Sequence, residues 1–419
     1  MLSALDLVLD HFQELSAAPS RMLHGRLCWR RKHNEPPPWR NLPKVPPRRS
    51  KVTPVKAGWI GGRRFDLVFF FGSALLAALV GAFALAVPGA VVPLFVAFLV
   101  LVDGPHLVAT WARTYLDPDF RARRGRLLAL SLAWLLPGLA AWSISRATGL
   151  RAPIDLFLLV AALWSFHHNV RQSYGVLAIY QHHARTALPA RKTDRLFLHG
   201  ALWLAFGLFS FGHPQNRVFL GLPAEPPRLL ATLGLVLLGL LLVATIVYGV
   251  YRRTRFRGED ERPLLYLLGP TLGLQLFALF VVGSFEPLVP RPADPEQAFM
   301  ASTVVGGIVH GVNYLGIIAA VSRRRFEGSD ARTLVASFGR RPLVAYAAFV
   351  LVSLGYLALN AARGVLPSLA PVSGGAALPE LFLVLYWGLF FHHYYIDQKI
   401  WHVREDQTLR FELGLGGAS

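Results

Sequence analysis

Ten apolar runs, each of about 20 residues, recur along the 419-residue chain. A helix of that length crosses the ~30 Å hydrocarbon core of a membrane. Composition agrees, because only 16% of the residues are charged, whereas soluble domains carry about 25%. The sequence therefore predicts an all-α, polytopic integral membrane bundle of about ten transmembrane helices, within a range of nine to eleven. The runs cover residues 65–87, 90–111, 127–145, 154–176, 196–213, 229–251, 264–284, 299–321, 343–360 and 380–401.

The basic residues fix the expected topology. The net charge of +19 is typical either of nucleic-acid binding or of the excess of Lys and Arg in cytoplasmic loops. With a cytoplasmic amino terminus, the inner segments hold 36 of the 43 Lys and Arg residues and the outer loops hold 6. The remaining basic residue, Arg171, lies within a span. We therefore expect a multi-pass protein of the cell inner (plasma) membrane, with both termini cytoplasmic, membrane lipids as partners and no nucleic acid.

Three regions follow from this pattern. Residues 1–64 form a cytoplasmic Pro- and Arg-rich arm that is too polar to fold alone, so we expect it to be largely disordered. Within it, residues 2–15 have the spacing of a short amphipathic helix. Residues 65–401 form the transmembrane bundle, and residues 402–419 form a cytoplasmic tail.

Metal chemistry is limited by the residue types available. The single cysteine, Cys28, excludes a disulfide framework and any site built on several thiolates. Histidine is plentiful, with 14 residues, and imidazole suits iron, zinc and similar metals.

Histidines recur inside the predicted spans, where ionisable residues are costly and usually functional. His106, His168, His310 and His393 lie 16, 14, 11 and 13 residues past the outer starts of four spans that run in the same direction. At 1.5 Å per residue these positions are about 17 to 24 Å deep, in one layer of the cytoplasmic half. Four helices thus present imidazoles at one level, as a metal site requires.

Polar neighbours accompany this layer. The segments FHHNVRQ at 166–172 and FHHYYID at 391–397 each hold a histidine pair, so that His167 and His392 precede the residues already named. Gln172 and Asp397 follow the second histidine of each pair at i+4, on the same helix face, where they can orient the ring or act as ligands. Asp103 stands three residues before His106. Arg171 needs an acceptor, for which Asp103, Asp397 or an anionic substrate group are the candidates.

Two cofactors and two kinds of function remain open. Haem fits less well, because the histidine separations on the two paired helices differ, 14 residues between His168 and His182 against 9 between His393 and His402. A poly-histidine non-haem iron centre tolerates ligands from several helices. Buried His, Asp and Arg also mark proton- or ion-coupled transporters, in which the same layer would be the transport site.

The motifs Asp-Gly-Pro-His at 103–106, the FHH pairs and the stretch from Asp397 to Trp401 resemble those of polytopic histidine-cluster membrane oxygenases. These include the β-carotene dioxygenase-like and the fatty-acid desaturase/hydroxylase-like groups. The resemblance implies an oxidoreductase with one or two non-haem iron ions, a redox partner and an apolar, lipid-like small-molecule substrate. It implies the metal ligands His106, His167, His168, His310, His392 and His393, and the catalytic residues Asp103, Arg171, Tyr314 and Asp397. The substrate slot would be lined by Trp164, Phe166, Trp387, Phe390 and Phe391.

Overall fold

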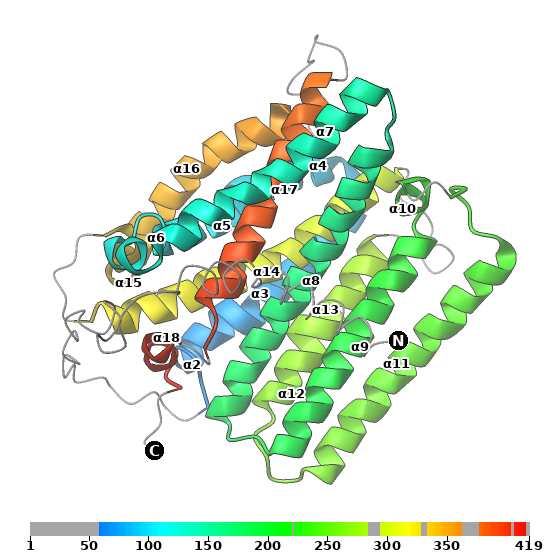
Figure 1. Ribbon diagram of the computed structural model, residues 1–419. Helices are drawn as coiled ribbons and strands as arrows, with labels where there is room; N and C mark the ends of the chain where they lie inside the picture. Colours follow the sequence, from blue (N-terminus) through cyan, green and yellow to red (C-terminus); the bar gives the residue numbers. More distant parts are fainter. Residues whose placement is uncertain are drawn as a thin grey trace, which may run out of the picture. The chain divides into compact units, whose positions relative to one another are not determined.

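The computed structural model describes residues 58–219, 222–283, 294–327, 333–362, 377–403 and 406–415. Every regular element in these ranges is a helix (Figure 1), which confirms the predicted all-α class. Seven helical segments in the same ranges are long and apolar enough to cross a membrane. They are Arg63–Ala86, Pro88–Arg113, Pro118–Thr148, Leu188–Gly212, Arg228–Arg255, Arg262–Val282 and Pro295–Arg325.

The other three predicted spans are also helical. They correspond to α8 (Ala152–His183), α16 (Pro342–Ala362) and α17 (Ala377–Ile400). The apolar stretches of α8 and α17 are interrupted by the histidine pairs, and the apolar part of α16, Pro342–Ala358, is shorter. The described chain is therefore a bundle of apolar helices, while the count of about ten crossings and the side of the termini stay predictions.

Several of the long helical segments consist of two or more shorter helices that follow one another directly. Turns of π-helix at Leu67–Phe71 and Leu99–Asp103 join α2 to α3 and α4 to α5, and a 3-10 turn at Leu132–Leu135 joins α6 to α7. Two further π-helical turns, Leu267–Gly273 and Phe277–Val282, flank α13. The bounds are α2 Arg63–Asp66, α3 Gly72–Ala86, α4 Val91–Phe98, α5 Gly104–Arg113, α6 Pro118–Ser131, α7 Leu136–Thr148, α9 Leu188–Gly212, α10 Pro214–Phe219, α11 Arg228–Arg255, α12 Arg262–Tyr266, α13 Leu274–Leu276, α14 Pro295–Arg325, α15 Leu334–Arg340 and α18 Gln407–Glu412.

Helix ends follow local sequence signals. Asp117, Asp294 and Asp406 each accept a hydrogen bond from a backbone N–H of the first turn that follows, in α6, α14 and α18. Proline occupies the first position of α6 and α14, where its missing N–H costs nothing. Gly149 ends α7 in the left-handed conformation, with φ 73°.

Helix α14 is the central element of the bundle. It packs against α3, α4, α5 and α15, and 78% of its most apolar window is buried. By contrast, α11 packs mainly on α9 and has 11% of its window buried, so most of its apolar surface faces outward (Figure 1). Such a surface suits lipid, because every backbone group of a helix is already hydrogen-bonded.

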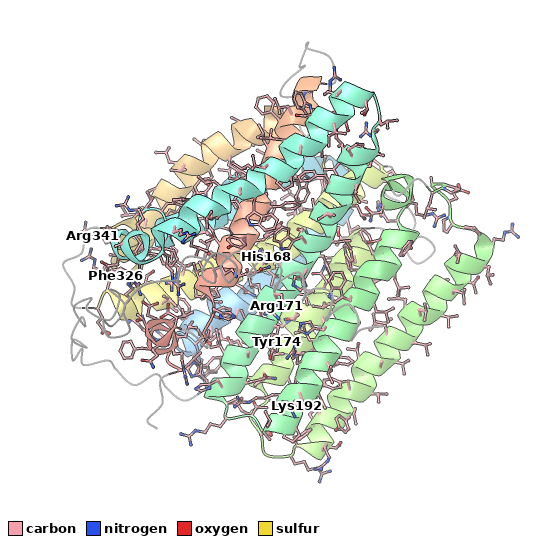
Figure 2. All side chains as sticks on the ribbon, in the orientation of Figure 1. His168, Arg171, Tyr174, Lys192, Phe326 and Arg341 are labelled. Carbon is pink, nitrogen blue, oxygen red and sulfur yellow. The ribbon has the colours of Figure 1, made fainter. Side chains whose placement is uncertain are left out.

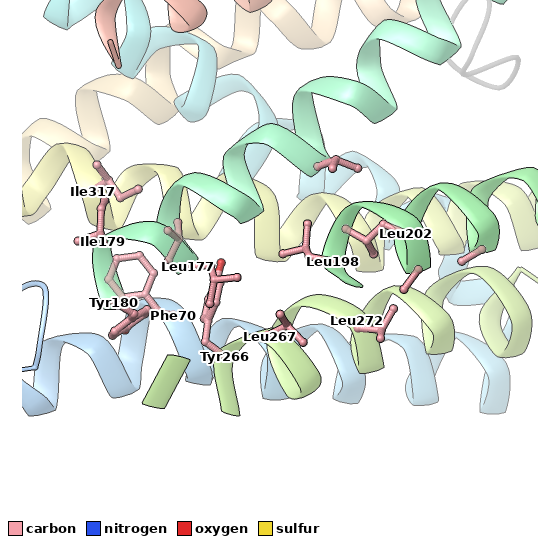
Figure 3. Packing of buried hydrophobic residues seen from close by; sticks show 14 of the residues in the cluster. Phe70, Leu177, Ile179, Tyr180, Leu198, Leu202, Tyr266, Leu267, Leu272 and Ile317 are labelled. Atoms are coloured by element: carbon pink, nitrogen blue, oxygen red, sulfur yellow. The ribbon is translucent and has the colours of Figure 1, made fainter. Parts of the chain in front are cut away.

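A large buried cluster holds α8, α9 and α12 together. Tyr180, Tyr266 and Phe70 are among its largest side chains, each less than 2% exposed, and Leu177 and Leu198 belong to the same cluster (Figure 3). The rings of Tyr180 and Tyr266 are 5.4 Å apart. Close packing of this kind is a main source of helix association inside a membrane.

Residues at both predicted region boundaries pack into the bundle. Ile60, which precedes the predicted boundary at residue 64, is fully buried in the cluster around Tyr180. In the predicted tail, Leu409 and Leu413 of the α18 region are 1% exposed and join the same cluster. The predicted amphipathic helix at 2–15 and most of the arm lie outside the described residues.

Candidate metal centre

Three helices bring four ligand-type side chains together. His106 on α5, His168 on α8, and His393 and Asp397 on α17 each offer one ligand atom, and these atoms lie within 4.8 Å of one another. All four residues are buried, with relative exposures of 1%, 6%, 0% and 4%. His168 lies midway along α8 (Figure 2). This group can hold a metal ion.

A fifth candidate ligand comes from α14. The ring of His310 lies 4.8 Å from that of His106 and 5.0 Å from that of His168, measured between centroids. The rings of His106 and His393 are 4.6 Å apart, and those of His168 and His393 are 5.2 Å apart. The four histidines that the sequence placed at one depth therefore share one interior site.

The ring nitrogens of this site lack protein partners. Among the described residues, neither nitrogen of His106 has a hydrogen bond, nor do Nε2 of His168, Nε2 of His393 and Nδ1 of His310. A buried polar atom without a partner costs free energy comparable to a missing hydrogen bond, and most such atoms in proteins are paired. Since a neutral imidazole has one lone pair, each of these four rings can offer one nitrogen, and unpaired nitrogens on neighbouring rings are the pattern expected of lone pairs reserved for a metal.

Thr110 sets the orientation of His393. Its Oγ1 lies 2.6 Å from the hydroxyl of Tyr314, 3.1 Å from Nδ1 of His393 and 3.3 Å from Oδ1 of Asp397. Because Tyr314 donates its own proton to Asp397, the single proton of Oγ1 goes to Tyr314 or to Asp397. We therefore assign the bond to His393 as Nδ1–H donating to Oγ1. Nε2 of His393 is then left with a free lone pair that faces the site, which is the usual role of a partner behind a metal-binding histidine.

Asp397 is held by one oxygen and offers the other. Tyr314 donates to Oδ1 at 2.9 Å, beside the bond from Thr110. Oδ2 lies 3.6 Å from Nε2 of His393 and 3.8 Å from Nε2 of His168. With a cation bound, Asp397 would be ionised and would contribute one negative charge to the centre through Oδ2.

Glycines on α14 allow its close approach to α4 and α5. A Cβ on Gly307 would lie 2.3 Å from the ring of Phe98, and one on Gly311 would lie 2.6 Å from the side chain of Val102. Either atom would overlap its neighbour, so a larger residue would push the helices apart. These two glycines flank His310 and let its ring come within 4.8 Å of the His106 ring.

His167 and His392 are not part of this group. Each precedes a grouped histidine by one residue, and a step of one residue turns a side chain about 100° around a helix. The hydroxyl of Tyr115 lies 2.9 Å from Nε2 of His392. The ring centroid of His167 lies 6.4 Å from that of Trp203. The structure therefore does not bring these two predicted ligands to the centre.

Two predicted catalytic residues lie away from the centre. The hydroxyl of Tyr356 donates to Oδ2 of Asp103, and Tyr356 also bonds Tyr386 at 3.1 Å. Arg171 is exposed on α8 and contacts neither Asp103 nor Asp397 among the described residues. Of the four predicted catalytic residues, only Tyr314 and Asp397 contact or belong to the group.

Gln172 and the predicted slot residues also have other neighbours than the sequence predicted. Gln172 does not orient His168, because its side chain donates to the backbone carbonyl of His310 at 2.7 Å. The ring of His199 on α9 lies 5.4 Å from that of Tyr174. The slot residues separate: Phe166 stacks on Phe206 of α9, while the others pack on the α17 side.

A buried ionic cluster lies at the end of α5 beyond the centre. Arg113 pairs with Glu412 of α18 at 3.0 Å, and both side chains are less than 8% exposed. Arg325 at the end of α14 pairs with Asp117 at 2.6 Å and lies 3.6 Å from Glu412. The bonds of Glu412 to Arg113 and Arg325 hold α18 against the ends of α5 and α14.

Sequence analysis did not identify Thr110 or Glu412 as functional. Thr110 follows His106 at i+4, the same spacing that drew attention to Asp397 after His393, so the signal was present. Glu412 lies in a short polar stretch that has no distinguishing pattern.

Comparison with known proteins gives no match. No family model, no curated protein and no solved structure is significantly similar to this chain.

Proposed function

We propose that this chain is an integral membrane metalloenzyme, a non-haem iron oxidoreductase that acts on a lipid-like apolar substrate. One observation carries the proposal: a buried group of three histidines and an aspartate, with unpaired ring nitrogens, inside a bundle of apolar helices. Structural packing alone gives no reason to bury so many unpaired polar atoms.

The donor set favours iron among the common metals. Nitrogen and carboxylate ligands without thiolate are typical of non-haem iron(II), for which two histidines and one carboxylate on one side of the metal are the recurrent arrangement. His106, His168, His393 and Asp397 include such a set, and His310 lies beside it. Zinc also accepts these ligands, so metal analysis must decide between the two.

The dimensions of the group favour a single ion. Bonds near 2.1 Å place opposite ligand atoms about 4.2 Å apart, and the ligand atoms here span at most 4.8 Å. A contraction of about half an ångström would bring all four within range of one ion. The packed rings, with centroids 4.6 to 5.2 Å apart, leave no plane for a porphyrin, which argues against haem.

When bound, iron would supply one-electron chemistry and the activation of dioxygen. The protein would hold the ion with neutral imidazoles, orient His393 through Thr110, and keep a proton on the Tyr314 hydroxyl next to Asp397. The surrounding apolar side chains would exclude water from the centre, as oxidation chemistry in a protein interior requires.

The location of the site favours an apolar substrate. The centre lies among helices whose outer surfaces suit lipid, so a substrate dissolved in the membrane would reach it from the side rather than from water. Aromatic rings line its α17 side, where Trp164 lies 4.7 Å from Phe391 and 6.0 Å from Tyr394. The distribution of Lys and Arg favours an inner membrane with cytoplasmic termini, and a separate redox partner would deliver electrons.

The resemblance to histidine-cluster membrane oxygenases belongs to this proposal. It rests on the short motifs around His106, His168 and His393, which are also the residues that group in the interior. The alternative, a proton- or ion-coupled transporter, would use the same layer without a tightly bound metal.

The test combines metal loading with product analysis. The detergent-purified full chain is loaded with iron(II) without oxygen, freed of excess metal, and then given dioxygen, a chemical reductant and a lipid extract of the host membrane. We expect dioxygen uptake and a lipid product whose mass is raised by one oxygen atom or lowered by two hydrogens. His168→Ala and His393→Ala should abolish both, whereas His167→Ala should not.

A metal-free protein that moves protons or ions in vesicles would contradict the oxidoreductase proposal and favour the transporter. Stoichiometric zinc without dioxygen uptake would contradict the redox assignment and retain the metal centre.

A further inference from the structure

A basic patch lies on the outer face of α8 and α9. It consists of Arg171 and Tyr174 on α8 and of Lys192, Arg195 and His199 on α9 (Figure 2). The guanidinium of Arg195 lies over the ring of Tyr174, 5.6 Å from its centroid, and the ring of His199 packs on the same tyrosine at 5.4 Å. Tyr174 therefore links the basic residues Arg195 and His199 of α9 to α8, and Arg171 precedes Tyr174 by three residues, which places it on the same side of α8.

The two arginines of this patch have no carboxylate partner among the described residues. Arg171, Lys192 and Arg195 are exposed, and neither arginine forms an ion pair. Asp194, the acid next to Arg195 in sequence, is fully buried and forms an ion pair with Arg252 at 3.0 Å. The acids of segment 256–261 pair with arginines of α11 and α12. The positive charge of the patch is thus not compensated by the described protein.

The depth of the patch makes this charge informative. Arg171 lies within the predicted span 154–176, and it follows His168 by three residues, which is about 4.5 Å along the helix axis. Tyr174 is another 4.5 Å or so further toward the end of α8. A guanidinium on a lipid-facing surface is costly unless its side chain extends to the head-group region or pairs with an anion there.

An anionic group outside the protein is the remaining acceptor for Arg171. The sequence offered Asp103, Asp397 and an anionic substrate group, and in the structure Asp103 accepts from Tyr356 and Asp397 accepts from Thr110 and Tyr314. Arg171 is exposed on α8, so within a membrane the anion that can reach it is that of a lipid head group. Arginine binds phosphate oxygens through paired N–H donors, and two arginines on adjacent helices can share one phosphate.

We propose that this patch is a binding site for the phosphate of an anionic phospholipid. Arg171 and Arg195 hold the phosphate, and Lys192 adds charge from the first turns of α9. The acyl chains extend along α8 and α9 toward Phe166, which packs against Trp203 and Phe206. The site is separate from the metal centre and does not depend on the proposed oxidoreductase activity.

The test uses short-chain phosphatidic acid added to the full-length protein in a nonionic detergent. Binding is followed by tryptophan fluorescence or thermophoresis and compared with phosphatidylcholine of the same chains and with inorganic phosphate. We expect phosphatidic acid to bind most tightly and its binding to weaken as salt is raised. The double variant Arg171→Gln/Arg195→Gln should bind it at least about tenfold more weakly. The matching lysine double variant should fall between, because lysine keeps the charge without the paired donors.

The control removes the same charge elsewhere. Arg253 and Arg255 are exposed at the end of α11. Arg253 pairs with Glu261 at 3.3 Å, and Arg255 lies 5.7 Å from the ring centroid of Phe256, a contact like that of Arg195 with Tyr174. Arg253→Gln/Arg255→Gln should retain full binding. Equally weakened binding in both double variants, equal affinity for phosphatidylcholine, or equally tight binding of inorganic phosphate would overturn the proposal. Circular dichroism and thermal unfolding of each variant verify that the bundle is intact.

Discussion

Replacing Thr110 with valine should weaken metal binding without removing a ligand. Valine has nearly the shape of threonine but cannot hydrogen-bond. The change therefore removes the hydrogen bonds of Oγ1 with Nδ1 of His393 and with the hydroxyl of Tyr314, together with the longer contact with Oδ1 of Asp397. His393 is then without the partner that fixes its ring and proton position. Asp397 keeps the bond from Tyr314 at 2.9 Å, so it stays near its position.

The size of the effect follows from the two hydrogen bonds that the valine cannot make. Each hydrogen bond contributes about 1 kcal/mol net, which gives about 2 kcal/mol for the pair. Removal of a partner behind a metal ligand commonly lowers affinity by roughly 10- to 100-fold, or about 1.4 to 2.7 kcal/mol. The two approaches agree, and we expect a rise of about 30-fold in the dissociation constant of iron(II).

The assay is a competition between the purified protein and a chromophoric chelator for iron(II) under nitrogen. Thr114→Val is the matched control, because Thr114 is also fully buried, lies one turn further along the same chain segment, and bonds only the backbone carbonyl of Thr110. Equal affinities for Thr110→Val, Thr114→Val and the unaltered protein would refute the orientation of His393 by Thr110.

Three further predictions test the centre and its surroundings. Iron(II) at a hundred times its dissociation constant should stabilise the unaltered protein and His392→Ala by about 2.7 kcal/mol but leave His106→Ala unchanged, as read from thermal unfolding; equal stabilisation of both variants would remove His106 from the ligand set. Burial, and then the charge of a nearby arginine, lower the pKa of His183 to about 4. Below about pH 6.5 the unfolded chain binds a proton there and the folded chain does not, so the free energy of unfolding should decrease by at most about 3 kcal/mol as the pH is lowered from 6.5 to 4. His183→Gln should flatten this part of the pH profile. Glu412→Gln should destabilise the protein by about 3 kcal/mol, because Arg113 is left buried without its anion, and an unchanged unfolding midpoint would contradict the role of that pair.

The helical architecture was predictable because apolar runs of membrane length are a strong signal. Each predicted run falls on a helical segment, including those interrupted by the histidine pairs. Sequence did not reveal the π-helical turn at Leu99–Asp103 just before α5, because such turns depend on packing between helices. The burial of Glu412 was equally hidden, since it depends on where a short C-terminal helix docks.

Depth along the helix was enough to find the four grouped histidines, but not to choose between adjacent residues. His106, His168, His310 and His393 share one level and one site, whereas His167 and His392 share the level and face elsewhere. The rotation of each helix decides this, and rotation is set by packing such as that of Gly307 and Gly311, which a single sequence does not display. The position of Arg171 on the outer face of α8 was hidden for the same reason.

The metal content of the purified protein tests the central claim most directly. The full chain is incubated with iron(II) without oxygen, freed of unbound metal on a desalting column, and analysed by inductively coupled plasma mass spectrometry alongside the double variant His168→Ala/His393→Ala. We expect one metal ion per chain in the unaltered protein and essentially none in the variant. No retained metal in the unaltered protein, or the same amount in both, would contradict a metal centre formed by His106, His168, His393 and Asp397.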